Sequence, residues 1–348
     1  MRRRLLGGAF LAGLGLIGLA QPLSAQSLRP YIDVHAHLFA VQARGIDDYS
    51  GAAQAAMRAM GELGALKMIV LPPPFPPDHP NSYDFEALLP IATRHPDKLA
   101  IMGGGGLLNP MLLDAVRAGQ VSPTLRQRFT LAAESLAARP IVGYGEIAVE
   151  HFSLGNLHPH LSVPADHPLL LLLCDIAAKH NLPIDLHMEA IERPADLDSR
   201  YRSPPNPARL MPNIEALERL LAHNRATRIL WAHAGWDNTG QRTAALTRRL
   251  LAAHPNLYIS LKMGPDSLAV NRPFERGIGL DPEWATLLID RSDRFLIGTD
   301  QFYVAPNSNR RFPQHPGSGR TLLDALPEDI ARRIGIENPL RVFPRLRS

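Results

Sequence analysis

The chain has 348 residues, of which 45% are hydrophobic and 20% are charged. This composition provides a sizeable buried core, and it excludes a disordered protein or a small disulfide-stabilised scaffold. The 37 basic residues include Arg2, Arg3 and Arg4; without residues 1–25, which contain no acidic residue, 34 basic residues face 33 acidic ones. A net charge of +1 argues against a nucleic acid or other polyanion as partner.

Residues 1–25 have the pattern of an export signal. Three arginines precede an apolar stretch from Leu5 to Ala20, and a run of small residues ends at Ala25. We expect cleavage after Ala25 and export to the periplasm, by the twin-arginine or the general secretory route, with no stable membrane association afterwards. The alternative is an uncleaved N-terminal anchor. The single cysteine, Cys174, cannot form an intramolecular disulfide.

From Leu28 onward, short β-rich segments alternate with longer helical patterns. The expected strands are Tyr31–His35, Met68–Leu71, Leu99–Gly103, Val142–Ile147, Pro183–His187, Arg228–His233, Leu257–Leu261 and Phe295–Thr299. The expected helices are Gly51–Leu63, Tyr83–His95, Leu125–Ala138, Pro168–His180, Ile214–His223, Thr239–Ala253 and Pro282–Arg291. No linker or repeat divides residues 26–348, so we expect one domain.

Strict alternation of strand and helix over eight strands predicts an α/β fold, a parallel (β/α)8 barrel. A doubly wound open sheet is less favoured, because no Gly-x-Gly-x-x-Gly follows the first strand. The longest connections all follow strands, which in a barrel places them at the C-terminal face, where substrates bind. These connections are residues 152–166, 189–212, 264–281 and 301–320.

Metal-ligand side chains end several of the expected strands. His35 and His37 are separated by one residue, so on an extended strand they project from the same face and can chelate one ion. Later strands end with Glu146, His187, His233 and Asp300. Because the spacings between these residues correspond to whole strand–helix units, we expect all six side chains to meet at the C-terminal end of the barrel.

This set of motifs resembles the amidohydrolase superfamily of metal-dependent (β/α)8 barrels, and more narrowly its amidohydrolase-related branch. The resemblance rests on Asp33-Val34-His35-Ala36-His37, on single histidines ending the fifth and sixth strands, on Gly298-Thr299-Asp300, and on the closing segment 335–343. It covers essentially all of residues 26–348. It implies that His35, His37, His187 and Asp300 bind a divalent metal, which we expect to be zinc.

Glu146 and His233 decide between one and two ions. In two-metal members of the superfamily, a carboxylate on the fourth strand bridges the ions and the histidine on the sixth strand binds the second. In one-metal members, including decarboxylases, that histidine acts on substrate or water instead. We favour two ions, since an unpaired buried glutamate beside a cation would otherwise need another partner.

The chemistry implied is the activation of water by the metal at neutral pH. Asp300 would accept the proton and pass it to the leaving group, and His233 and Lys262 would polarise a carbonyl or hold an anion. Lys262 could equally be an ordinary exposed lysine. Asp33 and Asp185 share strands with the histidines, where they could orient an imidazole or, equally, form a structural polar layer beneath the site. Glu150 and His151 could line the pocket, while His158 and His160 repeat the spacing in a loop.

These residues predict a hydrolase of an amide, ester or lactone bond in a small molecule. The alternative is a non-oxidative decarboxylase or hydratase of a small carboxylate. A non-catalytic exported metal-binding protein is disfavoured by Asp300, because storage needs no general base. A nuclease is disfavoured by the near-neutral charge. The sequence leaves the substrate and the oligomeric state open, and a homo-oligomer remains compatible with it.

Overall fold

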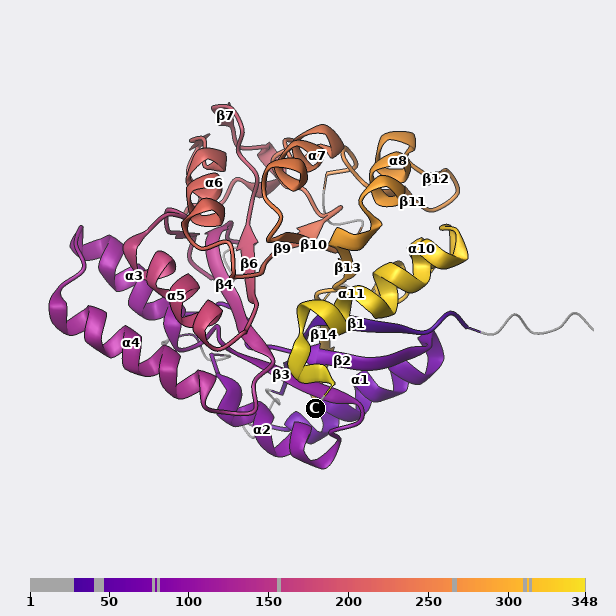
Figure 1. Cartoon of the computed structure of the whole chain (residues 1–348), viewed down its shortest axis with the longest axis horizontal. Helices are drawn as coiled ribbons and strands as arrows, with labels where there is room; N and C mark the ends of the chain where they lie inside the picture. Colours follow the sequence, from indigo (N-terminus) through magenta and orange to yellow (C-terminus); the bar gives the residue numbers. More distant parts are fainter. Residues whose placement is uncertain are drawn as a thin grey trace, which may run out of the picture.

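Figure 1 shows the computed structural model of the chain, which describes residues 28–40, 47–76, 79, 82–154, 158–264, 268–308, 312 and 315–347. The expected export signal lies outside these residues. Within the described part of the chain, no helix has both the length and the apolar character that a membrane span requires.

Eight parallel strands form a closed barrel, as predicted. Each strand pairs with the next in chain order, and the last pairs back with the first. The barrel strands are β1 (Tyr31–Phe39), β2 (Ala65–Val70), β3 (Leu99–Gly104), β4 (Gly143–His151), β6 (Ile184–Met188), β9 (Ile229–Ala234), β10 (Leu257–Leu261) and β13 (Phe295–Ile297). The predicted strands are thus confirmed, with ends that shift by a few residues.

Helices surround the strands in chain order, from α1 and α2 (indigo) to α8 (orange) in Figure 1. They are α1 (Tyr49–Leu63), α2 (Phe85–Arg94), α3 (Leu108–Ala118), α4 (Pro123–Ala137), α5 (Pro168–Lys179), α6 (Ile214–His223), α7 (Ala244–Ala253), α8 (Pro282–Asp290), α9 (Ser318–Asp324), α10 (Glu328–Arg332) and α11 (Asn338–Val342). Local chemistry sets several starts: Ser122 accepts a hydrogen bond from the Leu125 N–H, and Pro123 opens α4.

The helices differ from the expected set in two ways. The expected helices do not include α3, α9, α10 or α11; in α3, Pro110 lies in the first turn, where a missing N–H is tolerated. The helix expected from Thr239 begins only at Ala244. The reason is Asp237, whose carboxylate accepts hydrogen bonds from the backbone N–H groups of Thr239, Gly240 and Arg242 and so stabilises a turn instead.

The eighth strand is interrupted. β13 is followed by β14 (Gln301–Val304), and both pair with β1. In the gap, the Thr299 backbone N–H and hydroxyl both donate to the buried Asp33 carboxylate, at 3.0 and 2.6 Å. Burial raises the pKa of Asp33 to about 6. Asp33 therefore holds the barrel seam closed, which is the structural one of the two roles that the sequence allowed.

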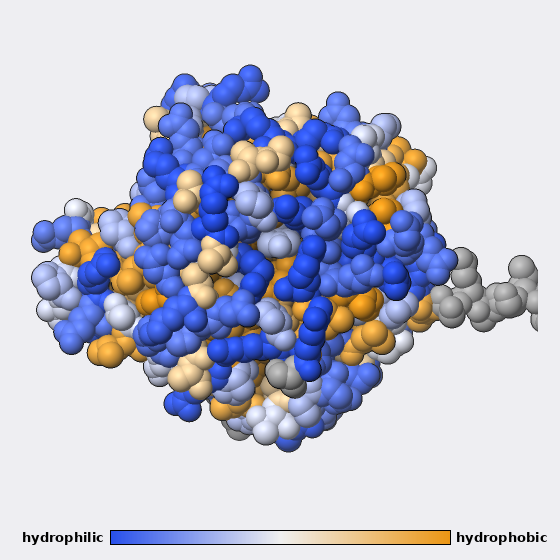
Figure 2. Space-filling model, in the orientation of Figure 1, coloured by the Kyte–Doolittle hydropathy of each residue, from blue (hydrophilic) through white to orange (hydrophobic). Residues whose placement is uncertain are grey.

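Apolar side chains pack in two main layers. The larger layer lies between the outer face of the strands and the helices, and a second cluster lies inside the barrel. Val342, Phe343 and Leu346 close that second cluster, and the yellow C-terminal segment lies in front of the strands in Figure 1. The outer surface in Figure 2 is mainly hydrophilic with scattered apolar patches.

The long connections carry short hairpin strands of their own: β5 (Leu161–Ser162), β7 (Ala195–Asp196), β8 (Arg209–Leu210), β11 (Phe274–Glu275) and β12 (Gly279–Leu280). A small separate apolar cluster links the connections that follow β4, β6 and β10; it contains Phe152, Ile191, Leu197, Tyr201, Leu210 and Leu268. These connections are therefore packed against each other and form a solid cover on one side of the barrel mouth.

Candidate metal centre

His35 and His37, near the end of β1, face each other with their Nε2 atoms 3.2 Å apart. The Nδ1–H of His37 donates to the Leu71 carbonyl at 2.8 Å, and the Nδ1 of His35 lies 3.1 Å from an oxygen of the Asp185 carboxylate. A carbonyl and a carboxylate only accept, so both Nδ1 atoms carry a proton, and Nε2 is the nitrogen that each neutral ring offers to a metal ion. The neighbouring carboxylates raise the pKa of both imidazoles against the effect of burial. Two close Nε2 atoms in surroundings that favour positive charge fit a divalent metal.

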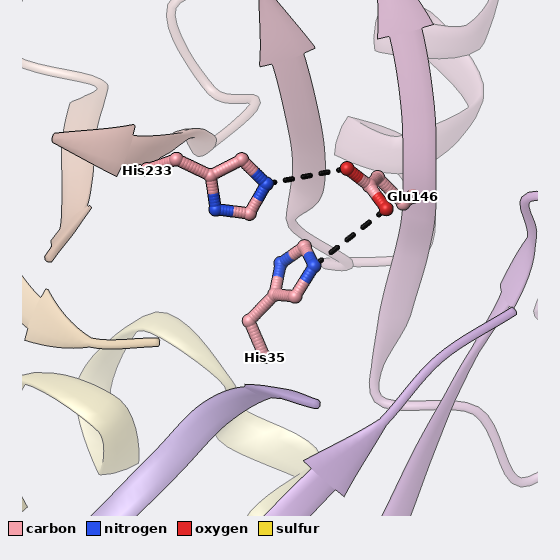
Figure 3. A group of neighbouring side chains, drawn as sticks. All are labelled: His35, Glu146 and His233. Carbon is pink, nitrogen blue, oxygen red and sulfur yellow. Dashed lines mark hydrogen bonds and ion pairs between the residues drawn. The ribbon is translucent and has the colours of Figure 1, made fainter. Parts of the chain in front are cut away.

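Glu146 lies at the centre of the histidine group and is 3% exposed. Its Oε1 faces His187 Nδ1 at 2.6 Å and His233 Nε2 at 3.3 Å. Its Oε2 faces His37 Nε2 at 3.4 Å and His35 Nε2 at 3.7 Å. Figure 3 shows His233 and His35 approaching different oxygens of this carboxylate. Each oxygen thus serves one half of the site, which is the arrangement that a bridging carboxylate needs.

Asp300 lies in the gap between β13 and β14, with a left-handed φ of +50°. Its Oδ1 is 3.0 Å from His37 Nε2, and its Oδ2 is 2.6 Å from the Lys262 ammonium. That ammonium also lies 3.8 Å from the ring centre of Trp236. Lys262 is only 12% exposed, so it is not a solvated surface lysine. It holds one oxygen of Asp300 and leaves the other aimed at the histidines.

His187 and His233 complete the group, with ring centres 4.8 Å apart. Two compact sets have ligand atoms within 4.8 Å of one another: His35, Glu146 and His233, and His35, His37 and Asp300. His187 stands beside these sets, since its Nδ1 binds Glu146 and its Nε2 faces the buried Glu189 at 3.9 Å. The structure therefore brings together all the expected side chains, with His187 at the edge.

Burial and the neighbouring charged and polar groups set the protonation states of Glu146, Asp300 and His233. Burial alone would raise the pKa of Glu146, but hydrogen bonds from His187 and His233 hold it well below its ordinary value. Burial is likewise outweighed at Asp300, where Lys262 keeps the pKa of the carboxyl well below its usual range. Burial lowers the pKa of His233 to about 3, so its imidazole is neutral. Anionic carboxylates and a neutral imidazole are the forms that bind a metal ion.

Several weaker predictions can be placed. Asp185 touches the His35 imidazole, as expected of an orienting carboxylate. His151 packs edge-on against His187 with ring centres 4.2 Å apart, and His158 stacks on His151 at 4.4 Å. His158 is therefore much closer to the centre than a loop position suggested. In the connections at the same end of the barrel, Trp236 is buried, whereas Arg202 is exposed.

Sequence reasoning missed three buried residues: Glu189, which follows the fifth barrel strand, and Asn238 and Arg242, which follow the sixth. Asn238 donates to Glu189 Oε1 at 2.6 Å, and Glu189 in turn faces His187. The available signal was the position of Glu189, two residues after His187 and so on the same side of an extended chain. No comparable pattern marked Arg242, because it follows a turn.

Comparison with known proteins gives matches at the level of family and fold. The family model described as amidohydrolase matches residues 32–345. A probable 2-pyrone-4,6-dicarboxylic acid hydrolase from Acinetobacter baumannii, with citric acid bound, is 13% identical, with a TM-score of 0.50 over 90% of this chain and 99% of that chain. No curated protein matches.

Decarboxylases are also among the similar structures. A 2,6-dihydroxybenzoate decarboxylase from Rhizobium is 16% identical, with a TM-score of 0.47 over 91% of this chain and 99% of that chain. A dihydroxybenzoic acid decarboxylase from Polaromonas, with bound manganese and an inhibitor, is 16% identical, with a TM-score of 0.47 over 92% of this chain and 98% of that chain. At such identities the likeness is one of fold.

Proposed function

This chain belongs to the amidohydrolase family of enzymes, and from its centre we propose that it is a metal-dependent hydrolase that cleaves an amide, ester or lactone bond in a small molecule with metal-activated water. The observation that carries the proposal is the convergence of histidine nitrogens on the two oxygens of the buried Glu146: those of His35 and His37 on one oxygen, that of His233 on the other. We propose two divalent ions, with zinc as the first candidate because nitrogen and carboxylate ligands suit it.

A divalent ion held by these side chains would supply activated water at neutral pH. The protein's own part is proton transfer and orientation. Asp300 Oδ1 points to the centre and accepts the proton of the attacking water, while Lys262 fixes Oδ2. The neutral His233 and the Lys262 ammonium lie on the same side of Asp300, at 3.7 and 2.6 Å, where they can polarise a substrate carbonyl.

The alternative reaction is decarboxylation or hydration of a small carboxylate. One observation favours it: Lys262 and His233 approach the same oxygen of Asp300, so in a site with one ion they would be placed to hold a substrate carboxylate. Hydrolysis remains the first proposal, because the bridging arrangement of Glu146 gives both of its oxygens a role.

We expect the purified protein to hydrolyse members of an amide, ester and lactone panel in a metal-dependent way. Dialysis against a chelator will abolish this activity, and readdition of zinc or manganese will restore it. The same samples should release no CO2 from aromatic or unsaturated carboxylates. Metal-dependent CO2 release without hydrolysis would instead establish the decarboxylase alternative, and activity that survives chelation would contradict both.

His35→Ala and His187→Ala are each expected to lower the metal content measured by elemental mass spectrometry. His35→Ala removes a lone pair from both compact ligand sets, so it should have the larger effect. His223→Ala is the matched control, because that histidine lies on α6 and pairs with Asp175 at the surface. A full metal complement in both site variants would refute the ligand assignment.

A further inference from the structure

His233 has a backbone conformation that its strand does not explain. Its φ is +74°, in the left-handed region that non-glycine residues rarely adopt. In β9, Ile229 and Trp231 pack outward into the layer between strands and helices, whereas Leu230 belongs to the barrel interior. Regular alternation would turn His233 outward as well. The left-handed residue instead directs its imidazole inward to Glu146, so something must hold the backbone in this conformation.

Arg242 contacts the two carbonyls that directly precede His233. Its Nη1 donates to the Ala232 carbonyl, and its Nη2 donates to the Trp231 carbonyl at 3.0 Å. The side chain is 3% exposed. Burial lowers the pKa of the guanidinium to about 9, which leaves it charged at neutral pH. Because this buried, charged guanidinium donates to two adjacent backbone carbonyls, it fixes the orientation of both peptide groups.

Trp231 extends this contact to the neighbouring strand. Its ring centre lies 4.0 Å from the guanidinium carbon of Arg242, and its indole N–H donates to the Met188 carbonyl at 2.7 Å. Met188 directly follows His187 at the end of β6. One stacked pair therefore contacts the backbone next to His187 on one strand and next to His233 on the other.

We propose that Arg242 and Trp231 form a clamp behind β6 and β9 that positions His187 and His233 against Oε1 of Glu146. Both are positioning residues, because they act through the backbone. This inference rests on the proposed function for its meaning, but it concerns geometry that exists without metal. The other half of the site has separate supports, since His35 and His37 are held by Asp185 and by the Leu71 carbonyl.

The clamp requires arginine. A planar guanidinium can stack on the indole and donate along two directions at once, whereas a lysine ammonium cannot reproduce both contacts. Asp237 holds the backbone of Arg242 in place. Its carboxylate accepts hydrogen bonds from the Arg242 backbone N–H at 2.9 Å and from the Asn271 side chain at 2.8 Å. The chain offers a matched control in Arg345, which donates to the carbonyls of Ala137, Arg139 and Ile141.

The test compares Arg242→Gln, Arg242→Lys and Arg345→Gln in the full chain. We expect both glutamine variants to lower the thermal midpoint of unfolding, because both leave backbone carbonyls without their guanidinium donor. Only the Arg242 variants should weaken zinc binding, by about tenfold or more for the ion nearest His233, with a changed absorption spectrum of the cobalt-substituted protein. Equal zinc affinity and an unchanged cobalt spectrum in Arg242→Gln would overturn the clamp.

A second measurement does not depend on metal. In crystals of metal-free Arg242→Gln, we expect His233 to have left its left-handed conformation and its Nε2 to have moved away from Glu146. Trp231→Phe, which keeps a ring but loses the bond to Met188, should give a weaker form of the same change. An unmoved His233 in both variants refutes the clamp, whereas a wild-type protein that binds neither zinc nor manganese would refute the proposed function alone.

Discussion

Asp300→Asn is expected to reduce turnover by about 10²–10⁴-fold while retaining most of the bound metal. The asparagine keeps the size and the oxygen that can accept from Lys262, but it cannot take a proton from water. His35, His37 and Glu146 remain to hold the metal, since the two compact ligand sets share His35. The measurement is kcat on the best substrate of the hydrolysis panel, together with metal content by elemental mass spectrometry.

Asp290→Asn is the matched control for this loss of charge. Asp290 ends α8 and pairs with Arg248 at the surface, so its variant should keep full activity. An Asp300→Asn protein as active as the wild type would refute the role of Asp300 as the proton acceptor. A protein that loses its metal together with its activity would make Asp300 chiefly a ligand.

Glu146→Ala is expected to lower the metal content from about two ions per chain to about one. The carboxylate is the only group of the centre whose two oxygens face opposite histidine pairs, so its removal separates the two halves. The ion between His35, His37 and Asp300 should remain. The decisive quantity is the ion count of protein purified without chelator.

Glu150→Gln provides the control on the same strand. Glu150 is also buried, but it binds His160 and Ser162 at 2.6 and 2.7 Å in the neighbouring connection. Its variant should retain every ion. About one ion in both wild type and Glu146→Ala would show that Glu146 is no ligand, and would move the proposal from hydrolysis to decarboxylation.

The barrel and the membership of the site could be predicted from the sequence, because both depend on periodic signals. Strand ends recur once per strand–helix unit, and ligand-type residues at those ends must meet. The details that depend on single backbone conformations could not. Alternation along β9 gives no sign that His233 is left-handed, and nothing near Arg242 indicates that its guanidinium reaches two carbonyls ten and eleven residues back.

The role of Lys262 is another detail that could not be predicted from the sequence. Its position after the seventh strand allowed either a site residue or a solvated lysine, because sequence does not show which neighbours cover a side chain. In the structure Lys262 is a site residue, and Gly235 helps to make it one. The backbone at Gly235 passes so near that a Cβ there would lie 2.6 Å from the Lys262 carbonyl oxygen. That close approach brings the end of β9 against the end of β10, and Trp236 beneath the ammonium.

The seam between Asp33 and Thr299 joins residues 266 positions apart. Synthesis runs from the N-terminus, so the strand with His35 and His37 must wait with one unpaired edge until nearly all of the chain has emerged. Closure of the ring is therefore a late event in folding, and a high contact order makes it slow. A polypeptide that stops before β13 would lack Asp300 and the seam together, and its exposed strand edge would favour aggregation over metal capture.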